Sequence, residues 1–282
     1  CATPAAPLPS TSRSLSVAET LANGVRHHVQ RIGKGDETVV FLHGLVMDNL
    51  SSWYFTVAAR VAKSADVILY DLRGHGKSER PASGYRTDDL VADLLGLLDG
   101  LQVTHPVHLV GNSLGGLLAL CFAAAHPDRV ASLALVDAHV GLAGWGDRMA
   151  ATLKLEGDDR DRMIGESFKT WLGRHSERKR TRLAKTAEAL VSSTSLVQDM
   201  KSSPSLGDTE FRRIACPVLA LYGEHSDVRD AGEKLAGLLP HCELRIVAGC
   251  SHSVLWEATD HVRQEIVTWV TAHARVAKGL RR

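Results

Sequence analysis

The stretch that decides the fold is Val107-His-Leu-Val-Gly-Asn-Ser-Leu-Gly-Gly116, where an apolar run leads into a Gly-x-Ser-x-Gly pattern. Ser113 lies between Gly111 and Gly115, and a helix-forming segment, Leu114–Ala125, follows. A strand that turns sharply into a helix needs small residues two positions either side of the serine, because larger side chains would collide there. The stretch therefore predicts a strained turn that exposes the Ser113 hydroxyl beside a helix N-terminus.

Short apolar runs alternate with helix-forming segments along most of the chain. Strands are predicted at runs rich in Val, Ile and Leu: Thr38–Leu42, Asp66–Tyr70, Val107–Val110, Leu133–Val136, Val218–Tyr222 and Leu244–Val247. Helices are predicted at longer segments: Ser52–Ala62, Thr87–Leu98, Leu114–Ala125, Ala231–Leu239 and Thr259–Val276. This alternation is typical of βαβ units and predicts an α/β fold with a mostly parallel central sheet flanked by helices.

The alternation is interrupted between residues 139 and 206, where helix patterns occur without a convincing strand. We therefore predict one catalytic core, made of residues 17–138 and 207–282, with an inserted helical lid at 139–206. Residues 1–16 are rich in Pro, Ala and Ser and are expected to form a flexible tail.

The composition of the 282 residues excludes several classes of protein. Lys and Arg number 33 against 32 Asp and Glu, and aromatic residues make up 5%, so nothing indicates binding to nucleic acid. Apolar runs end well before the roughly 18 residues that a membrane span requires. The sequence thus predicts a soluble globular protein without a membrane span.

The cysteines do not suggest a disulfide framework or a zinc site. They are few and scattered: Cys1, Cys121, Cys216, Cys242 and Cys250. No pair has Cys-x-x-Cys spacing, so we expect buried or free thiols, a reducing compartment and a cytoplasmic location. No secretory leader pattern is visible, and Cys1 is interpreted either as an artificial remnant or as the lipidated residue of a lipoprotein.

Two further turns carry groups that suit nucleophilic catalysis. His43-Gly44-Leu45 follows the first predicted strand, where backbone N–H groups can bind an oxyanion, and we assign the two donors to Leu45 and Leu114. His252 lies in a loop after the last predicted strand, a position that suits a general base. Among the 14 histidines it is this position that singles out His252.

A carboxylate is needed to orient the imidazole, and the residues alone leave alternatives open. Asp227 lies in the loop after the fifth predicted strand, and Asp137 lies at the end of the fourth. Glu224 and Asp230 are weaker candidates, interpreted as a loop carboxylate and a helix N-terminal charge.

Taken together, these motifs resemble the α/β-hydrolase superfamily. The matching stretches span most of the chain outside the predicted lid: His43-Gly44-Leu45, Asp71–Ser78, Gly111–Gly115, Gly223–Asp227 and Gly249–His252. The resemblance implies the chain order nucleophile, acid, histidine, and so favours Ser113, Asp227 and His252 as the triad. It also implies a structural role for the Asp71–Ser78 turn and no metal or organic cofactor.

The reaction implied by the resemblance is acyl transfer. Ser113 would cleave an ester or thioester of a small organic acyl substrate through an acyl-enzyme. Serine at this position argues against haloalkane dehalogenases and epoxide hydrolases, which carry Asp there. One alternative is a carbon–carbon bond hydrolase, and another is a natural-product lyase that eliminates acetate from, or cyclises, a polyketide-like intermediate. A receptor-like member that only binds a small molecule is a third reading, which the intact triad disfavours.

Substrate and partner contacts are predicted from side chains near these motifs and in the lid. Candidates for the substrate pocket are His43, Gly44, Trp53, Tyr54, Trp145, Met149, Phe168 and Trp171. The run from Arg174 to Lys185 holds six Lys or Arg and one Glu, a local net charge of +5. Such a run is commonly a solvated helix face, but it also suggests docking of an acidic acyl carrier protein that delivers a thioester.

Overall fold

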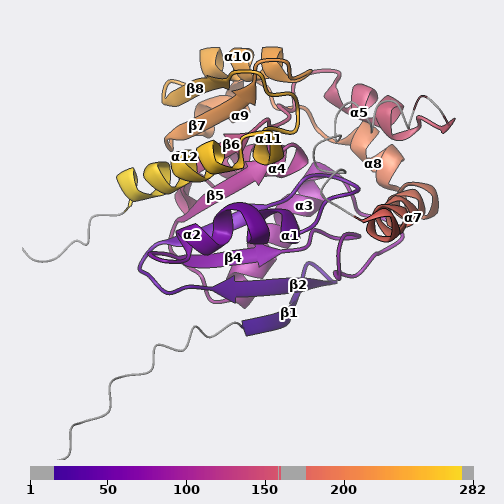
Figure 1. The fold of residues 1–282 in the computed structure, drawn as a ribbon, viewed down its shortest axis with the longest axis horizontal. Helices are drawn as coiled ribbons and strands as arrows, with labels where there is room; N and C mark the ends of the chain where they lie inside the picture. Colours follow the sequence, from indigo (N-terminus) through magenta and orange to yellow (C-terminus); the bar gives the residue numbers. More distant parts are fainter. Residues whose placement is uncertain (1–15, 158, 160–175, 275–282) are drawn as a thin grey trace, which may run out of the picture.

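One eight-stranded sheet forms the centre of the protein in the computed structural model, which describes residues 16–157, 159 and 176–274 (Figure 1). The strands lie in the order β1-β2-β4-β3-β5-β6-β7-β8. Their bounds are β1 Ser16–Ala22, β2 Val25–Ile32, β3 Thr38–Leu42, β4 Asp66–Tyr70, β5 Val107–Asn112, β6 Val130–Val136, β7 Val218–Gly223 and β8 Cys242–Val247. Strand β2 is antiparallel to β1 and β4, and every other pairing is parallel.

Helices cover both faces of this sheet, which explains why β3, β4 and β7 are buried at every residue. One face is packed by α3 (Thr87–Gly100), α4 (Leu114–Ala125) and α10 (Arg229–Leu238). The other is packed by α12 (Thr259–Ala272) and by the consecutive turns α1 (Ser51–Trp53), η1 (Tyr54–Ala58) and α2 (Ala59–Val61). The predicted α/β fold, with its mostly parallel sheet flanked by helices, is confirmed.

The antiparallel hairpin at the sheet edge is an element that the sequence analysis missed. Its turn is Asn23-Gly24, with φ values of 47° and 75°, the left-handed conformations that a two-residue hairpin turn requires. Strand β1 begins at Ser16, the last residue of the segment for which a flexible tail was predicted. The hairpin extends the sheet at one edge by two antiparallel strands.

Between β6 and β7 the described residues form helices joined by loops and contain no strand. The helices are α5 (Trp145–Leu153), α7 (Glu177–Ser193), α8 (Leu196–Ser202) and α9 (Asp208–Arg213). Helix α7 packs on the loop after β3, where Ala187 and Leu183 contact Met47. In α8 the Asp199 carboxylate accepts the N–H of Tyr85 at 2.8 Å. Figure 1 shows α5, α7 and α8 gathered at one side of the molecule.

Each described cysteine is a free thiol: Cys121, Cys216, Cys242 and Cys250. Burial raises the pKa of Cys121 to about 12 and the pKa values of Cys216 and Cys242 to about 11. These thiols therefore stay protonated near neutral pH and are poor nucleophiles. Within the described part of the chain, no helix is both long and apolar enough to cross a bilayer.

Candidate active site

The turn between β5 and α4 holds Ser113 in a strained conformation, with φ 51° and ψ −119°. Such a conformation is costly for a residue with a side chain and is kept where the surrounding structure enforces it. A Cβ on Gly111 would meet the carbonyl of Gly115, and a Cβ on Gly115 would meet the carbonyl of Leu42. The Gly-x-Ser-x-Gly spacing is thus required by backbone contacts, as the sequence analysis argued.

Replacing Gly115 by Ala is expected to lower the free energy of unfolding by more than about 2 kcal/mol, because the methyl group has no space between α4 and β3. Gly237 in α10 is the matched control, since a Cβ there meets nothing within 4 Å. Gly237→Ala should raise stability by up to about 1 kcal/mol through helix propensity. Urea denaturation followed by circular dichroism measures both, and equal stabilities would contradict this account of the turn.

His252 lies within reach of the Ser113 hydroxyl. Its Nε2 atom is 3.2 Å from Ser113 Oγ, and its Nδ1 atom is 2.7 Å from Asp137 Oδ2. The loop that carries it is fixed by Glu257, whose carboxylate accepts the Ser251 N–H at 2.7 Å and the Ser251 hydroxyl at 2.8 Å. Serine, imidazole and carboxylate are therefore connected in one chain of hydrogen bonds.

The carboxylate hydrogen-bonded to His252 is that of Asp137, whereas the sequence analysis favoured Asp227. Asp137 is buried at the end of β6, where it also accepts the Gly223 N–H at 2.7 Å and the hydroxyl of Ser226. The Asp227 carboxylate stands 3.7 Å from Nδ1 of His252, with 77% of its side chain exposed. Asp227 therefore lies at the rim of the site, with most of its side chain in solvent.

Two opposing effects act on the pKa of His252. Burial disfavours the charged ring and lowers this pKa, but the hydrogen bond and the negative charge of Asp137 raise it, with smaller contributions from Asp227 and Glu257. The net result is a pKa above the ordinary histidine value. The site therefore favours the imidazolium that forms when His252 accepts a proton.

The loop after β3 is held in place by hydrogen bonds of its own and runs close to Ser113. His43 donates from Nδ1 to the Gly44 carbonyl at 2.7 Å and accepts the Leu72 N–H at Nε2, at 2.9 Å. The Gly44 N–H donates to Asp48 at 2.7 Å and is not free for another acceptor. A Cβ on Gly44 would lie 3.6 Å from the Cβ of Ser113, so the loop runs close to the reacting hydroxyl.

The N–H groups of Leu45 and Leu114, predicted to bind the oxyanion, donate to no protein acceptor within the described residues. The Leu45 segment is shaped by its neighbour Val46, which has φ 67° and donates its N–H to Nε2 of His75 at 2.8 Å. A left-handed valine is unusual, and here its N–H is taken up by His75, whereas the N–H of Leu45 has no protein acceptor among the described residues. Backbone donors without a protein acceptor are what an oxyanion requires, so both groups stay candidates for this role.

Several side chains predicted to bind substrate are placed in the core. His43 and Trp53 are fully buried, and the indole N–H of Trp53 donates to the Leu42 carbonyl at 2.9 Å. Tyr54 is partly buried with its ring against Phe55, and Met149 is partly buried against the core. Trp145 on α5 is 5% exposed. Phe168 and Trp171 lie outside the described residues.

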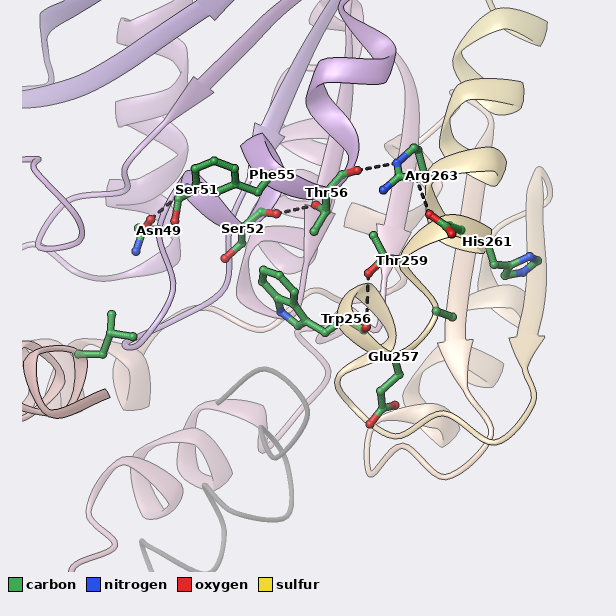
Figure 2. Close-up of a pocket in the computed structure, with 13 residues that line it drawn as sticks. Asn49, Ser51, Ser52, Phe55, Thr56, Trp256, Glu257, Thr259, His261 and Arg263 are labelled. Atoms are coloured by element: carbon green, nitrogen blue, oxygen red, sulfur yellow. Dashed lines mark hydrogen bonds and ion pairs between the residues drawn. The ribbon is translucent and has the colours of Figure 1, made fainter. Parts of the chain in front are cut away.

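A cavity of about 630 Å³ lies between η1 and the start of α12 (Figure 2). Trp256 of α11 (Val254–Glu257) and Phe55 line it, with Leu183 contributed by α7. Neither Ser113 nor His252 lines this cavity. Trp256 also packs against Met47, so the cavity borders the outer side of the loop after β3.

His139 is a residue of the site that the sequence analysis did not single out. Its ring centroid lies 5.7 Å from that of His252 and 5.9 Å from that of Trp145. The available signal was its place two residues after Asp137, at the carboxyl end of β6. As for metals, no group of three or more His, Cys, Asp or Glu suited to hold an ion occurs in the described ranges.

Comparisons with known proteins agree with this fold and with hydrolytic chemistry. A family model described as "alpha/beta hydrolase fold" matches residues 37–259. The chain is 30% identical, over 93% of its length and 96% of the relative's, to a 2-hydroxy-6-oxononadienedioate/2-hydroxy-6-oxononatrienedioate hydrolase of Paraburkholderia phymatum. Among solved structures it is similar to an enol-lactonase from Burkholderia xenovorans, with 25% identity, a TM-score of 0.72 and coverage of 90% of this chain and 100% of that one. An esterase from a Rhodococcus species is 27% identical, with a TM-score of 0.72 and coverage of 92% and 100%.

Proposed function

Because the chain belongs to the α/β-hydrolase fold family, we propose that it hydrolyses an ester or thioester of a small organic acyl substrate through an acyl-enzyme on Ser113. The observation that carries this proposal is the 3.2 Å contact between Ser113 Oγ and His252 Nε2 at a strained strand-to-helix turn. The names of the similar esterase and lactonase support the same class of bond.

In the first half-reaction His252 removes the Ser113 proton while the oxygen attacks the substrate carbonyl. The N–H groups of Leu45 and Leu114 receive the negative charge that develops on the carbonyl oxygen. Asp137 holds the imidazole with Nδ1 protonated and stabilises its charged form, since it is the buried carboxylate bonded to Nδ1. His252 then gives the proton to the leaving group, which departs as an alcohol or a thiol.

In the second half-reaction water replaces the leaving group. His252 takes a proton from that water, the resulting hydroxide attacks the acyl carbonyl, and the Ser113 oxygen leaves with the proton from His252. The products are a carboxylic acid and the regenerated enzyme. No step requires a group beyond those named.

The pH dependence follows from the protonation of His252, which must be neutral to act as a base. We expect kcat/KM to rise with pH through a pKa above the ordinary histidine value, because Asp137 stabilises the imidazolium. Asp227 also raises the pKa of His252, but less than Asp137 does. Asp227→Asn removes this contribution, so the pKa should fall and the acidic limb of the pH profile should move to lower pH. Asp208→Asn, an exposed change on α9, is the control and should leave the limb in place. An unchanged limb in Asp227→Asn would contradict this electrostatic account.

A second candidate function is hydrolysis of a carbon–carbon bond with the same residues. The observation in its favour is the Paraburkholderia phymatum relative, which is named for a 2-hydroxy-6-oxo dienedioate substrate. In that reaction His252 would assist at substrate carbon, with or without an acyl group on Ser113. A lyase that eliminates acetate or cyclises a polyketide-like intermediate uses the same base but needs no water.

One substrate panel distinguishes these functions. The wild type and Ser113→Ala are assayed with p-nitrophenyl esters, acyl thioesters and a 2-hydroxy-6-oxo dienedioate, and products are identified by mass spectrometry. Ester or thioester turnover that depends on Ser113 supports the proposal. Turnover of the dienedioate alone supports the carbon–carbon hydrolase, and a product formed without uptake of water from H₂¹⁸O supports the lyase.

We further propose that an acidic acyl carrier protein delivers the thioester, by docking on the basic face of α7. Arg178, Arg180, Arg182 and Lys185 are exposed along this helix. Leu183 and Ala187 of the same helix pack against Met47, so the exposed cations are carried by a helix that adjoins the loop after β3. Complementary negative charge on a carrier protein would raise the association rate and orient the carrier on this helix.

Reversal of charge tests the carrier proposal. Arg178→Glu combined with Arg180→Glu should lower kcat/KM for a carrier-bound thioester at least about tenfold and leave that for a small ester unchanged. The control reverses Arg60 and Lys63, two exposed charges near the start of β4, and should affect neither substrate. Equal losses for carrier-bound and small substrates, or none for either, would contradict docking on α7.

A further inference from the structure

A second histidine lies beside the ring of His252, and an indole lies beside that second histidine. His139 lies 5.7 Å from His252 and 5.9 Å from Trp145, ring centroid to ring centroid. The backbone N–H of His139 donates to the Ser113 carbonyl at 3.1 Å, which fixes His139 to the nucleophile turn. One stretch of chain after β6 thus supplies both the carboxylate that holds His252, Asp137, and a ring that faces it.

Among the described residues, the ring nitrogens of His139 and the indole nitrogen of Trp145 have no hydrogen-bond partner. Neither ring nitrogen of His139 takes part in a hydrogen bond among the described residues, whereas His43 and His75 use both of theirs. The indole nitrogen of Trp145 is buried and also lacks an acceptor there. A buried donor without an acceptor is costly, and a ligand atom that supplies the acceptor removes the cost.

The charge state of His139 limits what it can do. Burial, followed by the charges of His252 and Arg148, lowers the pKa of His139 to about 3. At neutral pH its ring is uncharged, so it carries one N–H donor and cannot compete with His252 for the reaction proton. The N–H of this neutral ring, the indole N–H of Trp145 and the nearby positive charge of Arg148 each favour an oxygen acceptor.

From this geometry we infer that His139 and Trp145 form a hydrogen-bonding subsite for an oxygen acceptor carried by the leaving group of the substrate. The inference rests on the proposed function. The leaving atom must lie within hydrogen-bond reach of Nε2 of His252, because that atom protonates it. The next few atoms of the leaving group are then within reach of the ring beside His252. An ether, carbonyl or hydroxyl oxygen two or three bonds from the leaving atom fits this position.

The test uses two esters of one acid that differ only in the leaving group: 2-methoxyethyl and n-butyl, which have the same length and shape. The ratio of their kcat/KM values is divided by the ratio of their alkaline hydrolysis rates, which corrects for intrinsic reactivity. For the wild type we expect a corrected preference of about fivefold for 2-methoxyethyl, the size of one hydrogen bond. His139→Phe should abolish the preference, and His139→Gln, which keeps a donor, should retain part of it.

Labelling of Ser113 by a fluorophosphonate is measured in each variant, so that a misfolded protein is recognised. Trp145→Phe provides an independent arm and should also reduce the preference. The same preference in the wild type and in the labelled His139→Phe and Trp145→Phe variants would overturn the subsite, as would no preference in a labelled wild type. If wild-type Ser113 is not labelled and neither ester reacts, the proposed function itself fails, and the two failures are thereby distinguished.

Discussion

Ser113→Ala is expected to lower kcat/KM for an ester substrate by about 10⁵-fold, because the oxygen that forms the acyl-enzyme is removed. Residual turnover should remain above that in water, since the donors at Leu45 and Leu114 and the binding contacts stay in place. Steady-state kinetics with a p-nitrophenyl ester measure the effect. A loss of this size identifies Ser113 as the nucleophile only if the variant is folded.

The fold of the variant is checked by its circular dichroism and its urea denaturation curve. Ser113 has a strained backbone and a side chain with few contacts to lose, so Ser113→Ala should be at least as stable as the wild type. Ser251, in the loop that carries His252, provides the matched variant: Ser251→Ala loses a hydrogen bond to Glu257 but no reacting atom. Ester turnover by Ser113→Ala within tenfold of the wild type would rule out an acyl-enzyme on this residue.

Asp137→Asn is expected to lower kcat/KM by about 10⁴-fold, the second largest effect. The amide keeps the size of the side chain but no longer stabilises the imidazolium, and an amide N–H facing His252 favours the tautomer protonated at Nε2. That tautomer cannot accept the Ser113 proton. The substitution should also lower the pKa of His252, because the principal cause that raises it is removed.

Asp227→Asn is the matched comparison, since Asp227 is the other carboxylate near Nδ1 of His252. Its side chain is mostly exposed and at 3.7 Å forms an ion pair rather than a short hydrogen bond. Exposed pairs contribute little, so we expect less than about a tenfold loss. The opposite ranking, with Asp227→Asn the more damaging variant, would return the orienting role to the β7 loop as first predicted from the sequence.

The core of the fold was accessible from the sequence because its signals are local. Strands β3 and β4 were predicted with their observed bounds, since each is a buried apolar run that stops at a turn. The Asn23-Gly24 turn carried an equally local signal for the β1–β2 hairpin. The hairpin was not predicted, because apolar and polar residues alternate irregularly in β2 and the strand lies close to the Pro-rich start of the chain.

Which of Asp137 and Asp227 is hydrogen-bonded to His252 could not be predicted from the sequence, because it depends on contacts between segments that are distant in the chain. Both aspartates follow strands whose carboxyl ends meet at the same edge of the sheet. Which one reaches His252 depends on the left-handed backbone of Asp137, with φ 47°, and on the Gly223 N–H that holds its carboxylate. Chain order alone contains neither fact.

Burial in the core explains why an aromatic residue that was predicted to line the substrate pocket does not face it. Trp53 follows the loop after β3 closely in sequence and was therefore expected to shape the pocket. Its ring instead packs against Phe41 beneath the sheet, where its N–H finds the Leu42 carbonyl. The position of a residue along a helix near the site predicts proximity, but the direction of its side chain depends on which face of that helix packs on the core.

The most direct measurement of the central claim is the rate at which a fluorophosphonate modifies Ser113, followed by peptide mass spectrometry in the wild type, Asp137→Asn and Asp227→Asn. The reaction needs only the nucleophile, its base and the oxyanion donors, so it does not depend on the identity of the substrate. We predict a single adduct on Ser113, formed at least about 10³-fold more slowly in Asp137→Asn and at nearly the wild-type rate in Asp227→Asn. An adduct on another residue, or a rate that Asp137→Asn leaves unchanged, would contradict a nucleophile at Ser113 activated by His252 and oriented by Asp137.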